Sequence, residues 1–199
     1  MGNIWCALRT FDDHAKEMGG EALQSPRFFL KPSGALAEPN LGCDLVLPKH
    51  LVEVHHEVEL VLKLGDDLDC SQVAIGLDLT DRVTQKIAKS EGMPWTQSKG
   101  FANSAIVGNF SKPPIELPHL RLELAINGNL RQESSIDEMR FSPLELIDEL
   151  STWAPIDAGD LLFCGTPAGV GPMQRGDHVQ ARLLSEDGTI ISELDFILA

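Results

Sequence analysis

The sequence predicts an α+β fold that is rich in strands, with mixed or antiparallel sheets and a few short helices. Short apolar runs bounded by turn signals recur along the chain, and only a few segments have helical periodicity. Strands and helices are interspersed without the regular alternation of a doubly wound fold. Because its 199 residues contain no internal repeat and no long linker, we expect one domain over residues 1–199.

Two helices are expected in the first half of the chain. The stretch DDHAKEM, residues 12–18, predicts a short one. A longer helix is expected from about Asp81 to Glu91, and Gly92 provides its stop signal. Val83 and Ile87 are expected to face inward from this helix.

A third helix is expected in SPLELIDELSTW, residues 142–153. Ser142 is its predicted N-cap, Pro143 takes the first helical position, and Glu145 completes a capping box. The apolar residues expected along its packing face are Leu144, Ile147 and Leu150.

Residues 120–134 have the pattern of a β-hairpin. Two strand-like runs, LRLELAI and NLRQES, flank the dipeptide Asn127-Gly128. This dipeptide is typical of a type I′ turn, since both central positions need a positive φ.

Charge and cysteine usage exclude several classes of function. The chain carries 30 acidic against 16 basic residues and a formal charge of -14, which opposes binding to nucleic acid or anionic membranes. No segment has the pattern of a secretion signal or the length of a membrane span. Four scattered cysteines form no C-x-x-C pair, so we expect reduced thiols and a cytoplasmic location.

The stretch HHEVELVLKL, residues 55–64, is the most informative strand candidate. Side chains two residues apart in a strand share a face and lie roughly 7 Å apart, so Glu57 and Glu59 could approach one ion. Pattern alone favours a different interpretation. The apolar residues occupy the other phase of the strand, which leaves both glutamates on the nominally solvated face.

Asp78 is a third acidic candidate. It lies between Leu77 and Leu79 in a short apolar run that predicts a buried strand. A buried carboxylate is unfavourable unless a partner or a metal neutralises it. Three carboxylates without His or Cys would suit a hard cation such as Mg²⁺ or Mn²⁺.

His14 and Glu17 stand three residues apart, on one face of the first expected helix. The carboxylate could orient the imidazole as a general base. An exposed His–Glu pair without function is the commoner explanation of this spacing, so the motif decides nothing by itself.

Two further features have both a chemical and a simpler interpretation. Lys99 follows the second helix among aromatic residues, where its ammonium could face an anion or simply reach water. The glycine-rich loop after residues 161–164 could hold a carboxylate through its N–H groups and the Thr166 hydroxyl. Its spacing fits neither common nucleotide-binding loop.

Taken in order, these stretches resemble the fumarylacetoacetate hydrolase superfamily, and within it the short branch of acylpyruvate hydrolases and oxaloacetate decarboxylases. The similarity runs over nearly the whole chain. The segments that carry it are HAKEM (14–18), FFLKPS (28–33), LPKHLVEVHHEVEL (47–60), GLDLTDRVTQ (76–85), PWTQSKGF (94–101), INGNLRQ (126–132) and GDLLFCGTPAGVGP (159–172).

The resemblance implies a β-rich mixed-sheet roll, usually a homodimer, with Mg²⁺ or Mn²⁺ in its active site. It also implies a role for each matching residue. The metal ligands would be Glu57, Glu59 and Asp78, the catalytic residues His14 and Glu17 of a lid together with Lys99, and the residues around the substrate Arg82, Gln85 and Thr166.

The reaction implied by this resemblance starts from a small 2-oxo acid. The metal and Lys99 would stabilise the enolate that forms when a bond to the adjacent carbon breaks. If His14 and Glu17 activate water, an acylpyruvate is hydrolysed at a C–C bond, and this is the expected function. Decarboxylation of oxaloacetate and keto–enol tautomerisation need no attacking water and stay open as alternatives.

One segment departs from the family pattern. Where close relatives usually carry G-R-N-Y before the lid histidine, this chain has Leu8, Arg9, Thr10 and Phe11, and it contains no Tyr. The lost amide and phenol leave a second interpretation open, in which the protein binds metal and 2-oxo acids but is catalytically impaired.

Overall fold

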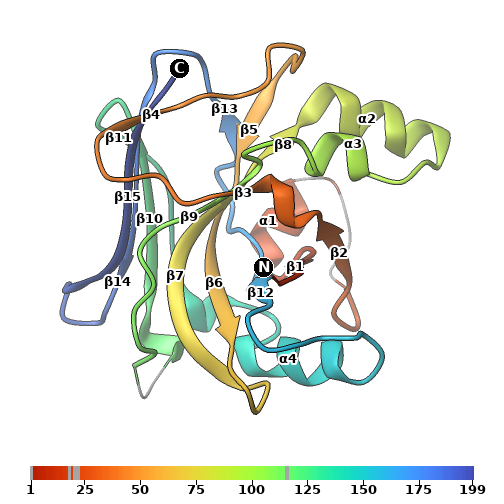
Figure 1. The fold of residues 1–199 in the computed structure, drawn as a ribbon, viewed down its shortest axis with the longest axis vertical. Helices are drawn as coiled ribbons and strands as arrows, with labels where there is room; N and C mark the ends of the chain where they lie inside the picture. Colours follow the sequence, from red (N-terminus) through yellow and green to blue (C-terminus); the bar gives the residue numbers. More distant parts are fainter. Residues whose placement is uncertain (1, 18, 20–22, 115–116) are drawn as a thin grey trace.

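The computed structural model describes residues 2–17, 19, 23–114 and 117–199, and two large sheets dominate it (Figure 1). The larger sheet has seven strands, in the order β2-β1-β12-β6-β7-β9-β3. It is mixed, as predicted, because β1 pairs with β12 and β3 with β9 in parallel. Its strands are β1 (Ile4–Ala7), β2 (Phe28–Lys31), β3 (Leu36–Ala37), β6 (Val58–Leu64), β7 (Cys70–Asp78), β9 (Ala105–Val107) and β12 (Leu161–Phe163).

The second large sheet has five strands in the order β11-β10-β14-β15-β4, and a small sheet has the order β13-β5-β8. Together they contain β4 (Cys43–Leu45), β5 (Val54–His56), β8 (Thr80–Asp81), β10 (Arg121–Ile126), β11 (Asn129–Ser135), β13 (Gly171–Pro172), β14 (His178–Leu184) and β15 (Ile190–Leu198). Strands β10 and β11 form the predicted hairpin, and both Asn127 (φ 52°) and Gly128 (φ 75°) have the left-handed conformation that its turn requires.

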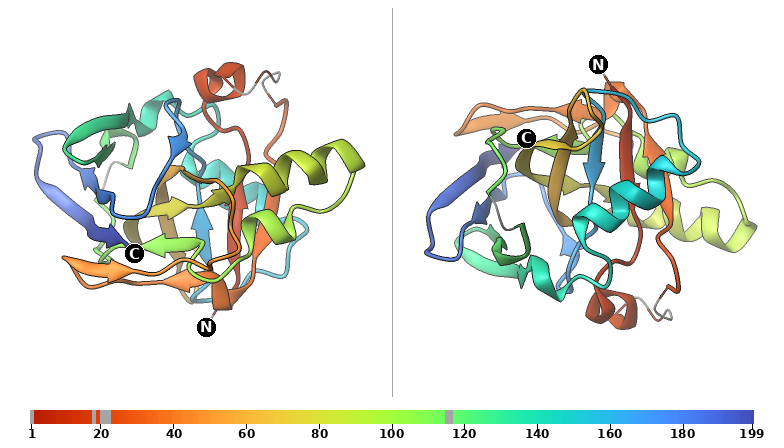
Figure 2. Two further views of the ribbon diagram at one scale, coloured as in Figure 1. Left: turned by 90° about the horizontal axis from the view of Figure 1, so that it is seen from above. Right: turned by 90° about the horizontal axis from the view of Figure 1, so that it is seen from below.

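Four α-helices and three short 3₁₀ helices complete the described chain. They are α1 (Asp12–Glu17), α2 (Arg82–Glu91), α3 (Thr96–Lys99), α4 (Pro143–Ser151), η1 (Ser33–Ala35), η2 (Leu117–His119) and η3 (Ile136–Glu138). Figure 2 shows α2 and α3 on the side of the molecule opposite to β14 and β15. Among the described residues no helix is long and apolar enough to cross a membrane, and all four cysteines are free.

The main core fills the space between the two large sheets. Leu60 and Leu62 of the larger sheet and Leu122, Leu183 and Phe196 of the smaller one are fully buried in one cluster. Each such side chain stabilises the fold by about 1.5–3 kcal/mol through the apolar surface it removes from water. These contacts fix β6 and β7 rigidly against the five-stranded sheet.

The opposite face of the seven-stranded sheet is tightly curled around a second, smaller cluster that includes Val61 and Phe163. A Cβ atom at Gly76 would lie 2.5 Å from Val61 and 2.8 Å from Phe163, so only glycine fits there. Glu59 and Asp78 point to this same face, because each lies two residues along the strand from Val61 and Gly76 respectively. The curl therefore brings two carboxylates of neighbouring strands together.

Two expectations about helix faces are wrong. Ile87 is 52% exposed and Val83 only half-buried, whereas Gln85 is the buried residue of α2. This helix covers a polar cavity rather than the apolar core, so its polar side faces inward. On α4 the predicted caps and Pro143 are confirmed, but Leu144 is 55% exposed. The buried stripe of α4 is Pro143, Leu146, Ile147 and Leu150, which has the i, i+3, i+4, i+7 spacing of one helical face.

The other elements predicted from the sequence are present in the structure, with one change. Helix α1 covers residues 12–17 of the expected 12–18, and Met18 lies outside the described residues. Helix α2 begins after the N-cap Asp81 and ends at Gly92 in the left-handed conformation. The expected strand 55–64 is interrupted at Glu57, because β5 joins the small sheet whereas β6 joins the large one.

Candidate active site

Three carboxylates converge where the small sheet meets the curled face of the large one. Glu57 occupies the break between β5 and β6, Glu59 lies on β6, and Asp78 ends β7. One oxygen of each lies within 4.8 Å of the others. Their exposed fractions are 6%, 2% and 1% respectively, so the solvated face that the pattern favoured for the glutamates is wrong. The groups that cover this face, which include Arg82, Lys99 and Gly165, come from segments distant in sequence.

Two cations that line the cavity are bound directly to this cluster. The ammonium of Lys99 lies 2.7 Å from Oε2 of Glu57 and 2.6 Å from Oδ2 of Asp78, and it is buried. The guanidinium of Arg82 donates to Oε1 of Glu57 at 2.6 Å and to Gln85 at 2.8 Å. Burial alone would raise the pKa of Glu57, but Lys99 and Arg82 outweigh it and hold this pKa at about 2. Glu57 is therefore ionised at any physiological pH.

Lys31 is a site residue that the sequence analysis missed. Its ammonium is fully buried and lies 2.7 Å from Oδ1 of Asp78. It donates its hydrogen bonds to the carbonyl oxygens of Leu79, Lys99 and Ser104. The contact with Asp78 is an ion pair between two buried groups. Lys31 thus ties the end of β2 to the segment that carries Lys99.

The cluster has the properties of a site for a hard divalent cation. Oδ1 of Asp78 is buried, and among the described residues its partner is the ammonium of Lys31 in an ion pair, with no hydrogen bond recorded to it. Burial raises the pKa of Glu59 well above its usual range, and the adjacent carboxylates Asp78 and Glu57 raise it further. The repulsion that acts on Glu59 is unfavourable in the protein alone, and a bound cation would relieve it. Carboxylate oxygens alone suit Mg²⁺ or Mn²⁺.

The glycine-rich loop does hold carboxylates, but they are the protein's own. The N–H of Gly165 donates to Oε2 of Glu59 at 2.7 Å, and the N–H of Gly169 lies 3.2 Å from Oε1 of Glu17. Gly165 needs its left-handed φ of 96°, and a Cβ there would lie 2.0 Å from the hydroxyl oxygen of Thr10. One loop therefore orients a candidate metal ligand and a residue of the α1 segment.

Thr166 belongs to a buried polar network that centres on Gln132, a second residue the sequence analysis did not assign. Nε2 of Gln132 donates to the Thr166 hydroxyl at 2.8 Å and to the Pro167 carbonyl at 2.9 Å. Oε1 of Gln132 accepts from the N–H of Val58 and contacts Nδ1 of His56. Because its oxygen already accepts this bond, the Thr166 hydroxyl can donate its proton into the cavity.

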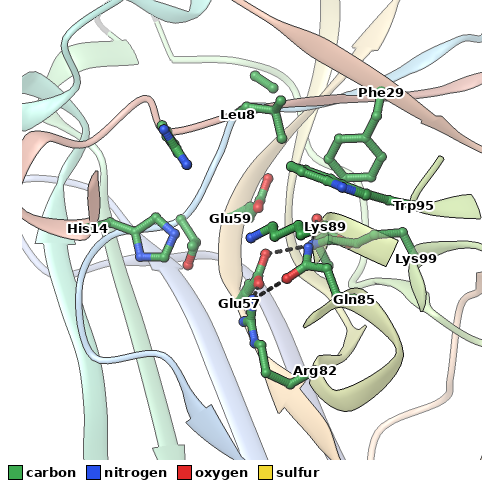
Figure 3. A pocket seen from close by; sticks show the side chains of 14 residues that line it. Leu8, His14, Phe29, Glu57, Glu59, Arg82, Gln85, Lys89, Trp95 and Lys99 are labelled. Carbon is green, nitrogen blue, oxygen red and sulfur yellow. Dashed lines mark hydrogen bonds and ion pairs between the residues drawn. The ribbon is translucent and has the colours of Figure 1, made fainter. Parts of the chain in front are cut away.

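His14 faces the carboxylates from the other side of the cavity (Figure 3). It is buried, and its Nδ1 lies 3.3 Å from Oε2 of Glu17. Burial lowers the pKa of His14 from 6.5, although the charges of Glu57 and Glu17 act in the opposite direction. The imidazole is therefore neutral near pH 7 and able to accept a proton.

The altered segment before α1 does not obstruct the cavity. Phe11 is buried and forms an isolated β-bridge with Met139, outside the cavity lining. Thr10 donates from its hydroxyl to the Cys164 carbonyl at 2.7 Å, which anchors the segment to the end of β12. Arg9 lines the cavity. The loss of a phenol and an amide has thus left the His14 segment in contact with the site.

The structure gathers almost the whole predicted set around one cavity. All the predicted site residues except Glu17 line it, and Glu17 reaches it through His14. Lining residues that sequence reasoning did not assign are Ala7, Leu8, Arg9, Phe29, Lys89 and Trp95. The ring of Phe29 contacts that of Trp95 edge-on at 6.2 Å, so one wall is aromatic and the other is charged.

The strand-rich roll and its buried carboxylate cluster define the class of this protein as a mixed-sheet α+β roll with a candidate metal site. The chain belongs to the fumarylacetoacetate (FAA) hydrolase family, whose model "Fumarylacetoacetate (FAA) hydrolase C-terminal" matches residues 3–194. This confirms the family that the sequence resembles.

Particular relatives are similar over most of their length. The chain is 38% identical over 200 residues to oxaloacetate tautomerase FAHD1, mitochondrial, from Mus musculus, covering 94% of this chain and 88% of the relative. A putative fumarylacetoacetate isomerase/hydrolase from Oleispira antarctica superposes with a TM-score of 0.94 at 31% identity, over 100% and 94% of the two chains. Fumarylpyruvate hydrolase from Pseudomonas aeruginosa, solved with Mn²⁺ and pyruvate, superposes with a TM-score of 0.88 at 29% identity. The match covers 99% of this chain and 90% of that one. These structures confirm the predicted fold.

Proposed function

We propose that this protein is a divalent-metal-dependent enzyme that stabilises the enolate of a small 2-oxo acid, with oxaloacetate as its first candidate substrate. The observation that carries the proposal is the buried convergence of Glu57, Glu59 and Asp78, with Lys99 in contact with two of them. The relative named as an oxaloacetate tautomerase supports the substrate, and the neighbour solved with Mn²⁺ and pyruvate supports the kind of ligand.

Each group of the chain would have a distinct part in enolate formation. A cation bound by the three carboxylates would act as a Lewis acid toward the 2-oxo group. Lys99 would place its positive charge beside the developing enolate oxygen, in a buried site where that charge acts strongly. The Thr166 hydroxyl would donate a hydrogen bond to the substrate carboxylate. Loss of the hydroxyl proton from the enol form of oxaloacetate, followed by protonation of the enolate at carbon, would be tautomerisation to the keto form. Loss of CO₂ from the keto form would instead leave the enolate of pyruvate, which protonation at carbon converts to pyruvate.

Hydrolysis of an acylpyruvate is the second candidate function, and the pair of His14 and Glu17 favours it. His14 is neutral, faces the carboxylates across the cavity and is oriented by Glu17 (Figure 3). It would take a proton from water as that water attacks the distal carbonyl of the substrate. The C–C bond then breaks, which yields pyruvate and a carboxylic acid.

A parallel assay distinguishes these reactions. Tautomerisation and decarboxylation of oxaloacetate and pyruvate release from acetylpyruvate are measured with Mg²⁺, with Mn²⁺ and after chelation. We expect Glu57→Ala and chelation to abolish all turnover, whereas His14→Ala should remove hydrolysis selectively. If the wild type binds metal but turns over neither substrate, the proposal fails and a catalytically impaired 2-oxo-acid-binding protein replaces it.

Three further predictions concern the state of the protein. We infer a homodimer and a single domain over residues 1–199, which sedimentation and limited proteolysis would test. A cytoplasmic location also stays a prediction, since the mouse relative carries the word mitochondrial in its name. Fractionation of cells that express the tagged chain would decide between the two compartments.

A further inference from the structure

The cavity contains more cations than its carboxylates use. Two of the lining cations, Arg82 and Lys99, are committed to Glu57 and Asp78 by ion pairs, as is Lys31, which does not line the cavity. Arg9 and Lys89 line the same cavity, and no ion pair to an acidic residue is formed by either of them in the part of the chain that the structure describes. A bound divalent cation would increase this excess of positive charge.

Lys89 is directed toward the cavity by the aromatic wall. It lies in the last turn of α2, and its Nζ is 4.9 Å from the ring centroid of Trp95. This cation–π contact favours a position over the ring rather than free extension into water. In Figure 3 the side chain of Lys89 extends from the side of Trp95 and Lys99 toward the space that His14 faces.

Arg9 is placed by an unusual backbone conformation. Its φ of 50° lies in the left-handed region, which is unfavourable for a residue with a Cβ by roughly 1–2 kcal/mol. Neighbouring bonds hold this turn, because Leu8 donates its N–H to Arg27 at 2.9 Å and Thr10 bonds to Cys164. Strain that the surroundings maintain is characteristic of functional positions.

The positive charge of Arg9 acts on Lys89, which is partly exposed where it lines the cavity. Partial burial lowers the pKa of Lys89, the positive charges of Arg82 and Arg9 lower it further, and the charge of Glu57 acts in the opposite direction. An anionic group of the substrate would remove this repulsion. Under the proposed function, a 2-oxo acid with one carboxylate would use that carboxylate at the metal cluster and Thr166, which would leave Arg9 and Lys89 without an anionic partner from the substrate.

We propose that Arg9 and Lys89 form a second anion subsite that binds the distal carboxylate of the substrate, so that the enzyme prefers dicarboxylic 2-oxo acids. This inference rests on the proposed function, since it presumes that the other carboxylate is bound at the metal cluster. Arg9 would provide a planar pair of donors and Lys89 a point charge. Both are specificity residues and take no part in bond breaking.

Kinetics with matched substrates test the subsite. Oxaloacetate is compared with its 4-methyl ester, which keeps the shape but loses the distal charge, in wild type, Arg9→Gln and Lys89→Gln. We expect each variant to raise KM for oxaloacetate by about tenfold or more, the effect of one lost charged contact. KM for the ester should change less than about twofold. Lys86→Gln is the control, because Lys86 is exposed on the same helix and does not line the cavity.

A binding experiment separates failure of the subsite from failure of the proposed function. L-malate and L-lactate differ by the distal carboxylate and have no keto group to enolise, so calorimetry on the Mg²⁺-loaded protein measures binding alone. We expect wild type to bind malate at least about tenfold more tightly than lactate, and Lys89→Gln to lose that preference. Equal affinity for both ligands in wild type would overturn the subsite while the proposed function stands. If neither ligand binds and oxaloacetate is not turned over, both proposals fail.

Discussion

Gln132 donates a 2.8 Å hydrogen bond to the hydroxyl of Thr166, and both side chains are buried. The same amide accepts from the N–H of Val58, one residue from each of the two glutamates of the cluster. A single side chain on β11 thus fixes the direction of a candidate substrate donor and the backbone between two candidate metal ligands. Gln132 is a positioning residue, since it does not line the cavity.

Removal of this amide should affect turnover through Thr166. We expect Gln132→Leu and Thr166→Val each to raise KM for oxaloacetate. In the double variant the increase in KM, expressed as a free energy, should be much smaller than the sum of the two single effects, because the two residues act as one unit. Gln132→Leu should also lower the free energy of unfolding by about 1–3 kcal/mol, since it leaves buried donors unpaired. Additive effects on KM would show that the two residues act independently.

Lys31 should be a major determinant of stability. Lys31→Met leaves Asp78 buried without its nearest cation on that side, and we expect a loss of about 3–5 kcal/mol in the free energy of urea unfolding. The double variant Lys31→Met, Asp78→Asn should recover most of the lost free energy of unfolding, because this variant has neither of the two buried charges. Lys63→Met is a suitable control, since Lys63 is partly exposed and contacts Phe110 instead of a buried carboxylate. Equal losses for Lys31→Met and Lys63→Met would contradict this account.

The rate of acylpyruvate hydrolysis should fall toward low pH, with a midpoint below 6.5. Burial holds the pKa of His14 below that value, and the protonated imidazole cannot accept a proton from water. Glu17 raises this pKa, so Glu17→Gln should move the midpoint to still lower pH. The profile of kcat against pH at saturating Mg²⁺ measures the midpoint for the wild type and for Glu17→Gln. A midpoint that moves upward in Glu17→Gln would exclude His14 as the titrating base.

Sequence reasoning identified the site best where a short motif carries it. Glu57 directly precedes β6, Glu59 lies on β6 and Asp78 ends the neighbouring strand β7, and local spacing together with the family resemblance was sufficient to group them. Lys99 and His14 were also placed correctly near this cluster. Pattern alone gave the wrong burial for the glutamates, because alternation within one strand does not reveal which distant segments, here those of Arg82, Lys99 and Gly165, cover its polar face.

The residues that were missed act through long-range contacts. Lys31 bonds to carbonyl groups 48 and 73 residues away, and Gln132 contacts His56 across 76 residues. Both lie in segments that carry the resemblance, FFLKPS and INGNLRQ, and a lysine directly after three apolar residues was the one available signal. The prediction of which face of α2 is buried was wrong for a related reason. Which side of a helix is buried depends on what it covers, and here that is a polar cavity.

The central claim is that Glu57, Glu59 and Asp78 together hold one divalent cation. Calorimetric titration of Mn²⁺ into the metal-free protein tests it most directly, with Glu53→Gln as a control for an exposed acidic residue near the same strand. We predict one ion per chain, and a loss of more than about 100-fold in affinity in Glu59→Gln and in Asp78→Asn, since even outer partners of metal ligands contribute 10- to 100-fold. If wild type binds no Mn²⁺, or binds it equally well in both variants, the carboxylate cluster is not a metal site and the enolate chemistry built on it is wrong.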